Sequence, residues 1–373
     1  MGPTPQQSAQ NAAAQNFAAR AALIQGGLHF IKKLQPVTGA LGSALRVPLE
    51  RTGVLTGIVL DISMPVDVTV AATQSPFGPY NLAQLVKYTD YAGVDRVFTA
   101  GPLLHYLNCF RGAKLLNNAQ KMDGYLTGAE TGVDTDILKF PTAVANDTIN
   151  FSLYIPIAYD PASDLRGAVL AQTIYGDHYV TVQTPQQLVG ADAYANPYTA
   201  GTVAAGGNIV VQAYQHYIMP QGGVTQLPMI DLSTIYAIEG NYVDNSNIAA
   251  GQSKYINWPN NRAIMSAIHA FINGGSGVLN GADLTQITLL GNSNTNIREM
   301  SPACLRRMMR YKLGVDLASG VYELSARAQP ITTQLYGNVQ TKLDVATANA
   351  NPYIASQYES FYMAGTPLPG IVQ

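Results

Sequence analysis

The chain has 373 residues, of which 12% are charged, and a net charge of −2. This length exceeds what one hydrophobic core usually organises, so two domains with tails are expected. The charged fraction is about half of the roughly 25% typical of soluble domains, which favours a surface largely covered by partner proteins. The near-neutral balance gives no indication of nucleic-acid binding.

Two cysteines, Cys109 and Cys304, are too few for a disulfide framework and fit no metal-binding spacing. We expect two reduced, buried thiols in preference to a bridge between them. No apolar run approaches the ~20 residues of a membrane span. The first residues lack a basic start that leads into an apolar run, so no signal peptide is expected.

Residues 1–45 contain no Asp or Glu, and the first acid is Glu50. They predict an N-terminal arm with an amphipathic basic helix, because apolar residues recur at spacings of four and three. Gly26 and Gly27 would weaken an isolated helix by ~2 kcal/mol relative to Ala, so a bend or formation on docking is expected. The apolar stripe comprises Phe17, Ala21, Ile24, Leu28 and Ile31, and the basic residues are Arg20, Lys32 and Lys33.

Long Arg and Lys side chains beside an apolar stripe can lie on a bilayer surface or an acidic partner while their charged ends stay in water. The same stripe is equally typical of a helix packed under its own domain, and the two interpretations are compatible.

From residue 47 onward, β-branched and alternating segments predict strands. Residues 230–238 are expected to open a second β-domain, and residues 346–373, with Glu359 as their one charge, resemble an arm that becomes ordered on a neighbour. Ser301–Tyr311 predicts a helix, with Ser301 as its cap and Pro302 in its first turn. The other expected strands are 54–64, 66–70, 148–157, 175–184, 208–217, 263–272, 287–290, 321–325 and 332–343.

No residue pattern predicts a catalytic, cofactor-binding or metal site. His105 and Cys109 share a helical spacing without a further ligand, and Asp177 and His178 are adjacent without a nucleophile. Asp134 and Asp136 could serve calcium or glycoside chemistry, but acid pairs in Thr- and Gly-rich loops are common. Gly274–Gly277 lacks the ending of a phosphate loop, and Arg306, Arg307 and Arg310 favour a solvated face or subunit contact.

Several short segments follow one another in an order that is typical of one protein family. They are Phe77–Pro79, Asn81–Leu82, Pro156–Tyr159, Asp164–Ala171, Leu227–Tyr236, Asn273–Ser276, Gly320–Tyr322 and Tyr336–Val339. Together they resemble the major capsid protein of tectiviruses, the membrane-containing icosahedral bacteriophages.

The resemblance implies an all-β fold of two fused eight-stranded antiparallel jelly rolls, with short helices and extended N- and C-terminal arms. The rolls would span 46–227 and 228–345, flanked by arms at 1–45 and 346–373. It also implies a non-enzymatic homotrimer that contacts neighbouring capsomers, vertex and minor capsid proteins, and the inner viral membrane through the N-terminal arm. Such a protein resides in the virion after assembly in the bacterial host cytoplasm, without cofactors or direct contact with nucleic acid.

Two other functions compete with this one. A jelly-roll carbohydrate-binding module would use Tyr- and Asn-rich loops, and a glycoside hydrolase would use Asp134 or Asp136.

Overall fold

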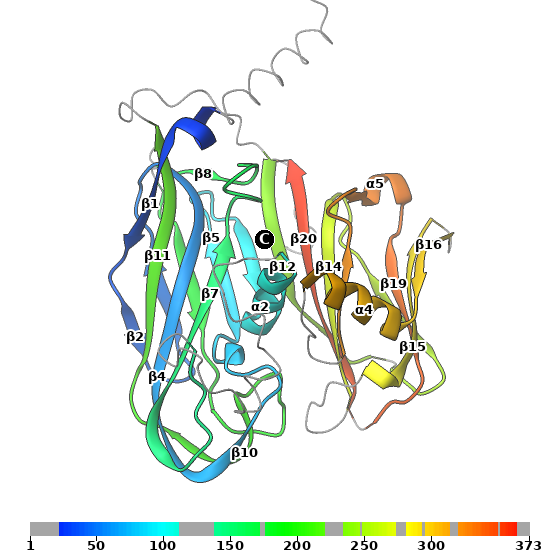
Figure 1. Ribbon diagram of the computed structural model, residues 1–373, viewed down its shortest axis with the longest axis horizontal. Coiled ribbons are helices and arrows are strands. Elements are labelled where there is room, and N and C mark those ends of the chain that lie inside the picture. Colours follow the sequence, from blue (N-terminus) through cyan, green and yellow to red (C-terminus); the bar gives the residue numbers. More distant parts are fainter. Residues whose placement is uncertain are drawn as a thin grey trace, which may run out of the picture.

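The computed structural model describes residues 22–111, 138–171, 176–220, 234–246, 248–273, 281–292, 295–313, 320–349 and 351–363. Strands dominate, and they form two barrel-like halves that lie side by side along the long axis (Figure 1). No helix among these residues is long and apolar enough to cross a membrane.

The first half is a jelly roll made of two facing sheets. One sheet has the order β1–β11–β4–β7, and the other has the order β3–β9–β5–β6. The strands of the first sheet are β1 (Gly27–Lys33), β11 (Ile209–Pro220), β4 (Val54–Gln74) and β7 (Ala145–Pro156), with the minor strands β2 (Val37–Gly39), β8 (Val169–Leu170) and β10 (Tyr198–Ala205). The facing strands are β3 (Ala44–Pro48), β9 (Tyr179–Gln183), β5 (Leu85–Thr89) and β6 (Asp95–Thr99).

The second half repeats this arrangement. Its sheets have the orders β12–β20–β14–β17 and β13–β19–β15–β16. The first sheet contains β12 (Thr234–Asp244), β20 (Tyr353–Met363), β14 (Ala263–Ile272) and β17 (Val321–Ser325), with the minor strand β18 (Ile331–Thr332). The second contains β13 (Ser253–Asn257), β19 (Gln340–Val345), β15 (Leu284–Gly291) and β16 (Thr295–Met300).

Alternation along the strands explains how the sequence forms these sheets. In β4, the even-numbered residues from Ile58 to Val68 are buried, because successive side chains point to opposite faces. The predicted strands 263–272 and 321–325 coincide with β14 and β17, and 54–64 and 66–70 join in β4. The strand predicted over 332–343 is interrupted by α5 (Thr333–Tyr336).

The longer helices lie between equivalent strands of the two rolls. Helix α2 (Gly101–Phe110) follows β6, and α4 (Pro302–Leu313) follows β16. The predicted cap of α4 is confirmed, because the backbone N–H of Cys304 donates to Ser301 Oγ at 3.2 Å. Two short 3₁₀ turns are η1 (Tyr80–Leu82) and η5 (Gly281–Asp283).

One sheet continues from the first roll into the second. Strand β12 pairs in parallel with β6 through Ile238 opposite Val97 and Glu239 opposite Phe98. The sheets β3–β9–β5–β6 and β12–β20–β14–β17, together with the minor strand β18 on β14, therefore form a single nine-stranded sheet.

The structure differs from the sequence prediction at both ends of the chain. Residues 22–26 are helical, but Gly27–Lys33 form strand β1, which pairs with β11 from Gly27 to Lys33. The strand replaces the predicted helix because a long-range ladder supplies backbone partners that the local stripe cannot reveal. At the other end, the expected arm contains β20, which lies between β12 and β14 in the second roll. Residues 1–21 and 364–373 lie outside the described residues.

Candidate functional site at the junction of the two rolls

The sequence candidates for catalysis do not form a reactive site. His105 Nε2 lies 3.5 Å from Cys109 Sγ on α2. Burial lowers the pKa of His105 to about 3 and raises the pKa of Cys109 to about 12. Both groups are therefore neutral at pH 7, and an active thiolate is not available.

Other candidates are separated or lie outside the described part of the chain. Asp177 forms an exposed ion pair with Arg51 at 3.2 Å. Within the described ranges, no group of three His, Cys, Asp or Glu residues could hold a metal ion. Asp134, Asp136 and residues 274–277 lie outside these ranges.

The two cysteines differ in their surroundings. Neither forms a disulfide bond; Cys109 is buried, whereas Cys304 is exposed on the solvent side of α4. The prediction of two buried thiols is therefore wrong for Cys304, because the buried side of α4 is formed by Leu305 and Met309.

The residues predicted to face the membrane do not lie together in one element of the structure. Phe17 and Arg20 lie outside the described residues, and Ile24 packs beside the buried Leu23. In β1, Lys32 Nζ forms an exposed ion pair with Glu50 Oε2 at 2.5 Å. The remaining members, Leu28, Ile31 and Lys33, are exposed on this strand, so the seven residues do not form one helical face.

The junction between the rolls is filled by helix α2. All ten of its residues are buried, and the helix contacts β7 of its own roll as well as β14 and α4 of the second roll. Burial of every residue, including the polar His105 and Asn108, is typical of a helix enclosed on every side. The Asn108 side chain donates to the Tyr154 carbonyl at 2.9 Å and fixes α2 on β7.

A buried charged cluster lies where α2 ends. The carboxylate of Glu359 on β20 is fully buried and accepts hydrogen bonds from Arg327 at 2.8 and 3.0 Å. The Tyr236 hydroxyl donates to Glu359 Oε1 at 2.8 Å, and Arg111 donates to the Tyr236 hydroxyl at 2.6 Å. Arg327 also pairs with Glu323. We call these five residues the junction cluster.

Neighbouring cations and a hydroxyl donor favour the ionised form of Glu359, although its carboxylate is buried away from water. Burial by itself would raise the pKa of Glu359, but Arg327, Arg111 and the Tyr236 hydroxyl outweigh it and hold that pKa below its usual value. A buried carboxylate is tolerated only when cations and hydrogen-bond donors satisfy it. The cluster therefore couples the end of α2 to the sheet of the second roll.

Two glycines permit close approach between the rolls. Gly167 has φ +87°, and a Cβ there would lie 2.3 Å from the Tyr236 Cβ. A Cβ on Gly240 would lie 2.4 Å from Thr99 Oγ1, next to the hydrogen bond from Thr99 to Gln357. Any side chain at either position would force β12 away from the first roll.

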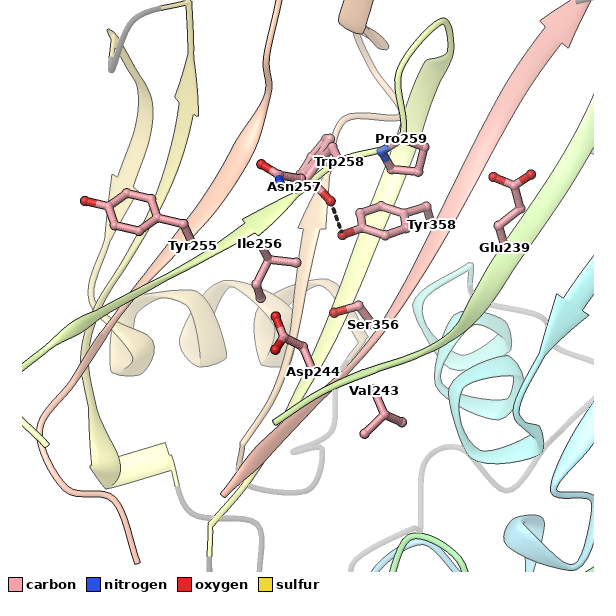
Figure 2. A pocket seen from close by; sticks show the side chains of 10 residues that line it. All are labelled: Glu239, Val243, Asp244, Tyr255, Ile256, Asn257, Trp258, Pro259, Ser356 and Tyr358. Carbon is pink, nitrogen blue, oxygen red and sulfur yellow. Dashed lines mark hydrogen bonds between the residues drawn. The ribbon is translucent and has the colours of Figure 1, made fainter. Parts of the chain in front are cut away.

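A groove of about 650 Å³ lies on the second roll, and Glu239 of β12 lines it on the side nearest the first roll (Figure 2). Tyr255 of β13, Trp258 just after that strand and Tyr358 of β20 line it, and the Tyr358 hydroxyl donates to the Asn257 carbonyl at 3.2 Å. Its carboxylates already have partners, since Glu239 pairs with Arg262 at 2.6 Å and Asp244 pairs with Lys254 at 2.7 Å. The groove therefore does not offer a free pair of acids for hydrolysis.

Sequence reasoning missed the junction cluster. The available signal was Glu359, the single charge within 346–373, because a lone acid among apolar and aromatic residues is often paired when buried. Nothing in the local sequence identifies its partners, which come from β12, from the residue that follows α2 and from the segment after β17.

The architecture is that of double jelly-roll capsid proteins. The major capsid protein of Sulfolobus Turreted Icosahedral Virus aligns with a TM-score of 0.65 and 13% identity, covering 90% of this chain and 97% of that one. The capsid protein of the virus PBCV-1 aligns with a TM-score of 0.60 and 11% identity, covering 90% and 93%.

The chain belongs to the P3 major capsid protein family. Residues 6–218 match its N-terminal domain, and residues 233–368 match its C-terminal domain. Major capsid protein P3 of Enterobacteria phage PRD1 is 27% identical over 378 residues, spanning 96% of this chain and 94% of that protein. The resemblance to tectivirus capsid proteins is thereby confirmed; the role of the chain is structural, in the virion capsid, and a carbohydrate-binding module is not favoured.

Proposed function

We propose that the chain forms a homotrimer, a pseudo-hexagonal capsomer of six jelly rolls, and that capsomers pack into an icosahedral shell around an internal viral membrane. The observation that carries this proposal is the rigid connection of the two rolls. The nine-stranded sheet and the junction cluster make each chain a block of two similar units. Three such blocks can approximate six-fold symmetry when they associate head to tail.

The low charge of the chain supports extensive burial between copies. Charged residues form 12% of the sequence, and depletion of charge is typical of the centre of stable interfaces. Specific assemblies need roughly 1,200–2,000 Å² of buried surface per contact, which a barrel side can supply.

Light scattering coupled to size-exclusion chromatography tests the trimer. We expect a mass three times that of the chain at micromolar concentration. A folded monomer under these conditions would contradict the proposal. Electron microscopy of particles from the source would test the membrane-lined shell.

The proposed role does not include catalysis or direct binding of nucleic acid, and assembly takes place in the bacterial host cytoplasm. Vertex and minor capsid proteins are the expected additional partners. The acidic side chains of the groove are held in ion pairs, and His105 and Cys109 are uncharged at pH 7. Both observations are consistent with a structural role.

The membrane contact is proposed for the segment before β1, which includes Phe17, Arg20 and Ile24. Lys32 pairs with Glu50, and Leu28, Ile31 and Lys33 belong to a sheet edge, so we do not assign them to the membrane. A basic residue near an anionic surface contributes ~1 kcal/mol, and many copies in a shell multiply this weak contact.

A truncation can test this contact without disturbing the roll. Removing residues 1–21 retains the buried Leu23 and all of β1. We expect unchanged trimers but weaker sedimentation with vesicles of phosphatidylglycerol. Arg20→Ala in the full chain provides the milder variant, and equal vesicle binding by all three proteins would contradict the membrane role.

A further inference from the structure

A cavity of about 370 Å³ lies on the first roll, where β3 ends and β9 begins. The two strands pair in an antiparallel ladder, with Pro48 opposite Tyr179, and β3 is the edge strand of the nine-stranded sheet. Along β3, Leu45 and Val47 are buried and Arg46 is exposed, so Arg46 lies on the outer face of the sheet. The cavity is therefore a feature of the roll surface, separate from the junction cluster.

Arg46 lines this cavity with a guanidinium that is held by an aromatic ring. Its Cζ lies 3.5 Å from the centroid of the Tyr179 ring, a contact that arginine makes readily with aromatic faces. Stacking orients the guanidinium and leaves the N–H groups at its edge able to donate. Within the described ranges, no hydrogen bond or ion pair uses these N–H groups. Arg46 is thus an oriented cation with donors to spare.

Arg51 adds a second positive charge to the cavity. Its Nη2 lies 3.2 Å from Asp177 Oδ1, in a pair whose side chains are 47% and 80% exposed. An ion pair this open to water binds its members weakly, so Arg51 can also bind another anion. Among the described residues that line the cavity, Asp177 is the single carboxylate against two arginines. The cavity consequently favours a negatively charged ligand.

His178 contributes a buried polar side chain to the same cavity. It is 2% exposed, and in the described part of the chain neither ring nitrogen has a hydrogen-bond partner. Burial lowers the pKa of His178, so its ring is neutral at pH 7. A buried polar group of this kind is commonly completed by a bound water or ion. An anion in the cavity would favour the protonated form of the ring and add a third cation beside it.

We propose that this cavity binds a phosphate group, either free phosphate or the headgroup of an anionic lipid. The planar fork of arginine matches two phosphate oxygens, and such charge-assisted pairs are stronger than neutral hydrogen bonds. A phosphate has more oxygens and more charge than a carboxylate, so it can use Arg46 and Arg51 together. Phosphate binding is additional to the structural role and does not depend on the trimer proposed above.

The position of the cavity makes a lipid headgroup a relevant source of phosphate. Shortly after Arg51 the chain reaches Val54, whose buried side chain packs in one cluster with Leu23. Leu23 belongs to the helical residues 22–26 that precede β1, at the upper end of the first roll in Figure 1. The segment proposed to contact the membrane therefore enters the roll on the side of the molecule towards which Arg51 leads.

Isothermal titration calorimetry with inorganic phosphate tests the cavity in the full chain. Ionic strength is held constant with sodium chloride, because salt screens exposed charges. We expect saturable binding to the wild-type chain and at least about tenfold weaker binding to Arg46→Gln, which lacks the charge-assisted hydrogen bonds. Arg307→Gln makes the same change of charge on α4 and should bind phosphate as the wild type does. Arg46 and Arg307 are both exposed, so both variants should fold, as circular dichroism would check.

Protection from phenylglyoxal is an independent measurement on the unmodified chain. The reagent modifies accessible guanidinium groups, and mass spectrometry of peptides reports each arginine separately. We expect saturating phosphate to slow the modification of Arg46 and Arg51 but not that of Arg307. Absence of saturable binding, equal affinities of the two variants, or equal slowing at all three arginines would overturn the proposal.

Sedimentation with phosphatidylglycerol vesicles distinguishes the two sources of phosphate. Weaker sedimentation of Arg46→Gln than of Arg307→Gln, together with the loss of phosphate affinity, supports the site with a lipid headgroup as its ligand. Equal sedimentation of the two variants, with phosphate affinity lost only in Arg46→Gln, supports the site with free phosphate as its ligand. The membrane contact of the segment before β1 is tested separately by removal of residues 1–21, so either proposal can fail without the other.

Discussion

Arg111 and Glu359 lie in different rolls, yet Arg111 Nη1 is 3.6 Å from Glu359 Oε1 in the buried junction. The Tyr236 hydroxyl bridges the two, accepting from Arg111 and donating to Glu359. This relationship joins the end of α2 to β12 and β20, the two strands of the second roll that lie nearest the first roll. The stability of the chain should therefore depend on residues that have no role in chemistry.

Substitution of Glu359 by Gln should lower the free energy of unfolding by about 3–5 kcal/mol, because the cations Arg111 and Arg327 would remain buried with less compensation. Chemical denaturation monitored by circular dichroism measures this loss. Glu299→Gln is the matched control, since Glu299 lies exposed on β16, and it should change stability by less than ~0.5 kcal/mol. Equal effects of the two substitutions would show that the junction cluster does not couple the rolls.

Gly167→Ala should destabilise the chain more than Gly93→Ala. Both glycines have positive φ, +87° and +76°, so each substitution carries a conformational cost of ~1–2 kcal/mol. A Cβ at position 93 meets nothing within 4 Å, whereas at position 167 it meets the Tyr236 Cβ at 2.3 Å. Crowding should add about 1–3 kcal/mol at Gly167. Thermal unfolding of the two variants checks the difference, and identical melting temperatures would contradict the close approach.

Mild acid should weaken the fold before the carboxylates titrate. Burial lowers the pKa of both His105 and His269 to about 3, below the ~6.5 of an unfolded chain. Their neutral forms therefore contribute stability that is fully present above pH ~6.5 and is lost as the pH falls towards 3. Each histidine should contribute about 1.4 kcal/mol per pH unit within this window.

Urea unfolding at pH 7.5, 6.5 and 5.5 measures this slope. Burial shifts the pKa of His178 and His216 in the same direction, so they add to it. His269→Gln should reduce the loss of stability between pH 6.5 and 5.5 by about 1 kcal/mol, because the unfolded imidazole is already half protonated at pH ~6.5. An unchanged slope would mean that the pKa of His269 is not lowered in the folded chain.

The regular parts of the fold could be predicted from local pattern. Alternation identified much of β4, because a half-buried strand repeats every two residues. Strands β14 and β17 are buried almost throughout and were identified as short apolar runs. The cap at Ser301 identified α4 for an equally local reason. Helix α2 escaped prediction because all of its residues are buried, which removes the amphipathic period that marks a surface helix.

The sequence by itself determined the β-class, the division into two similar halves, the absence of a recognisable catalytic motif and the family resemblance. Only the tertiary structure decided that Gly27–Lys33 form a strand, that Tyr353–Met363 lie inside a sheet, and that Glu359 meets Arg111. The physical reason is that strand pairing and buried ion pairs join residues far apart in the chain. A local stripe of Ile24, Leu28 and Ile31 fits a helix equally well until β11 supplies the ladder that β1 completes.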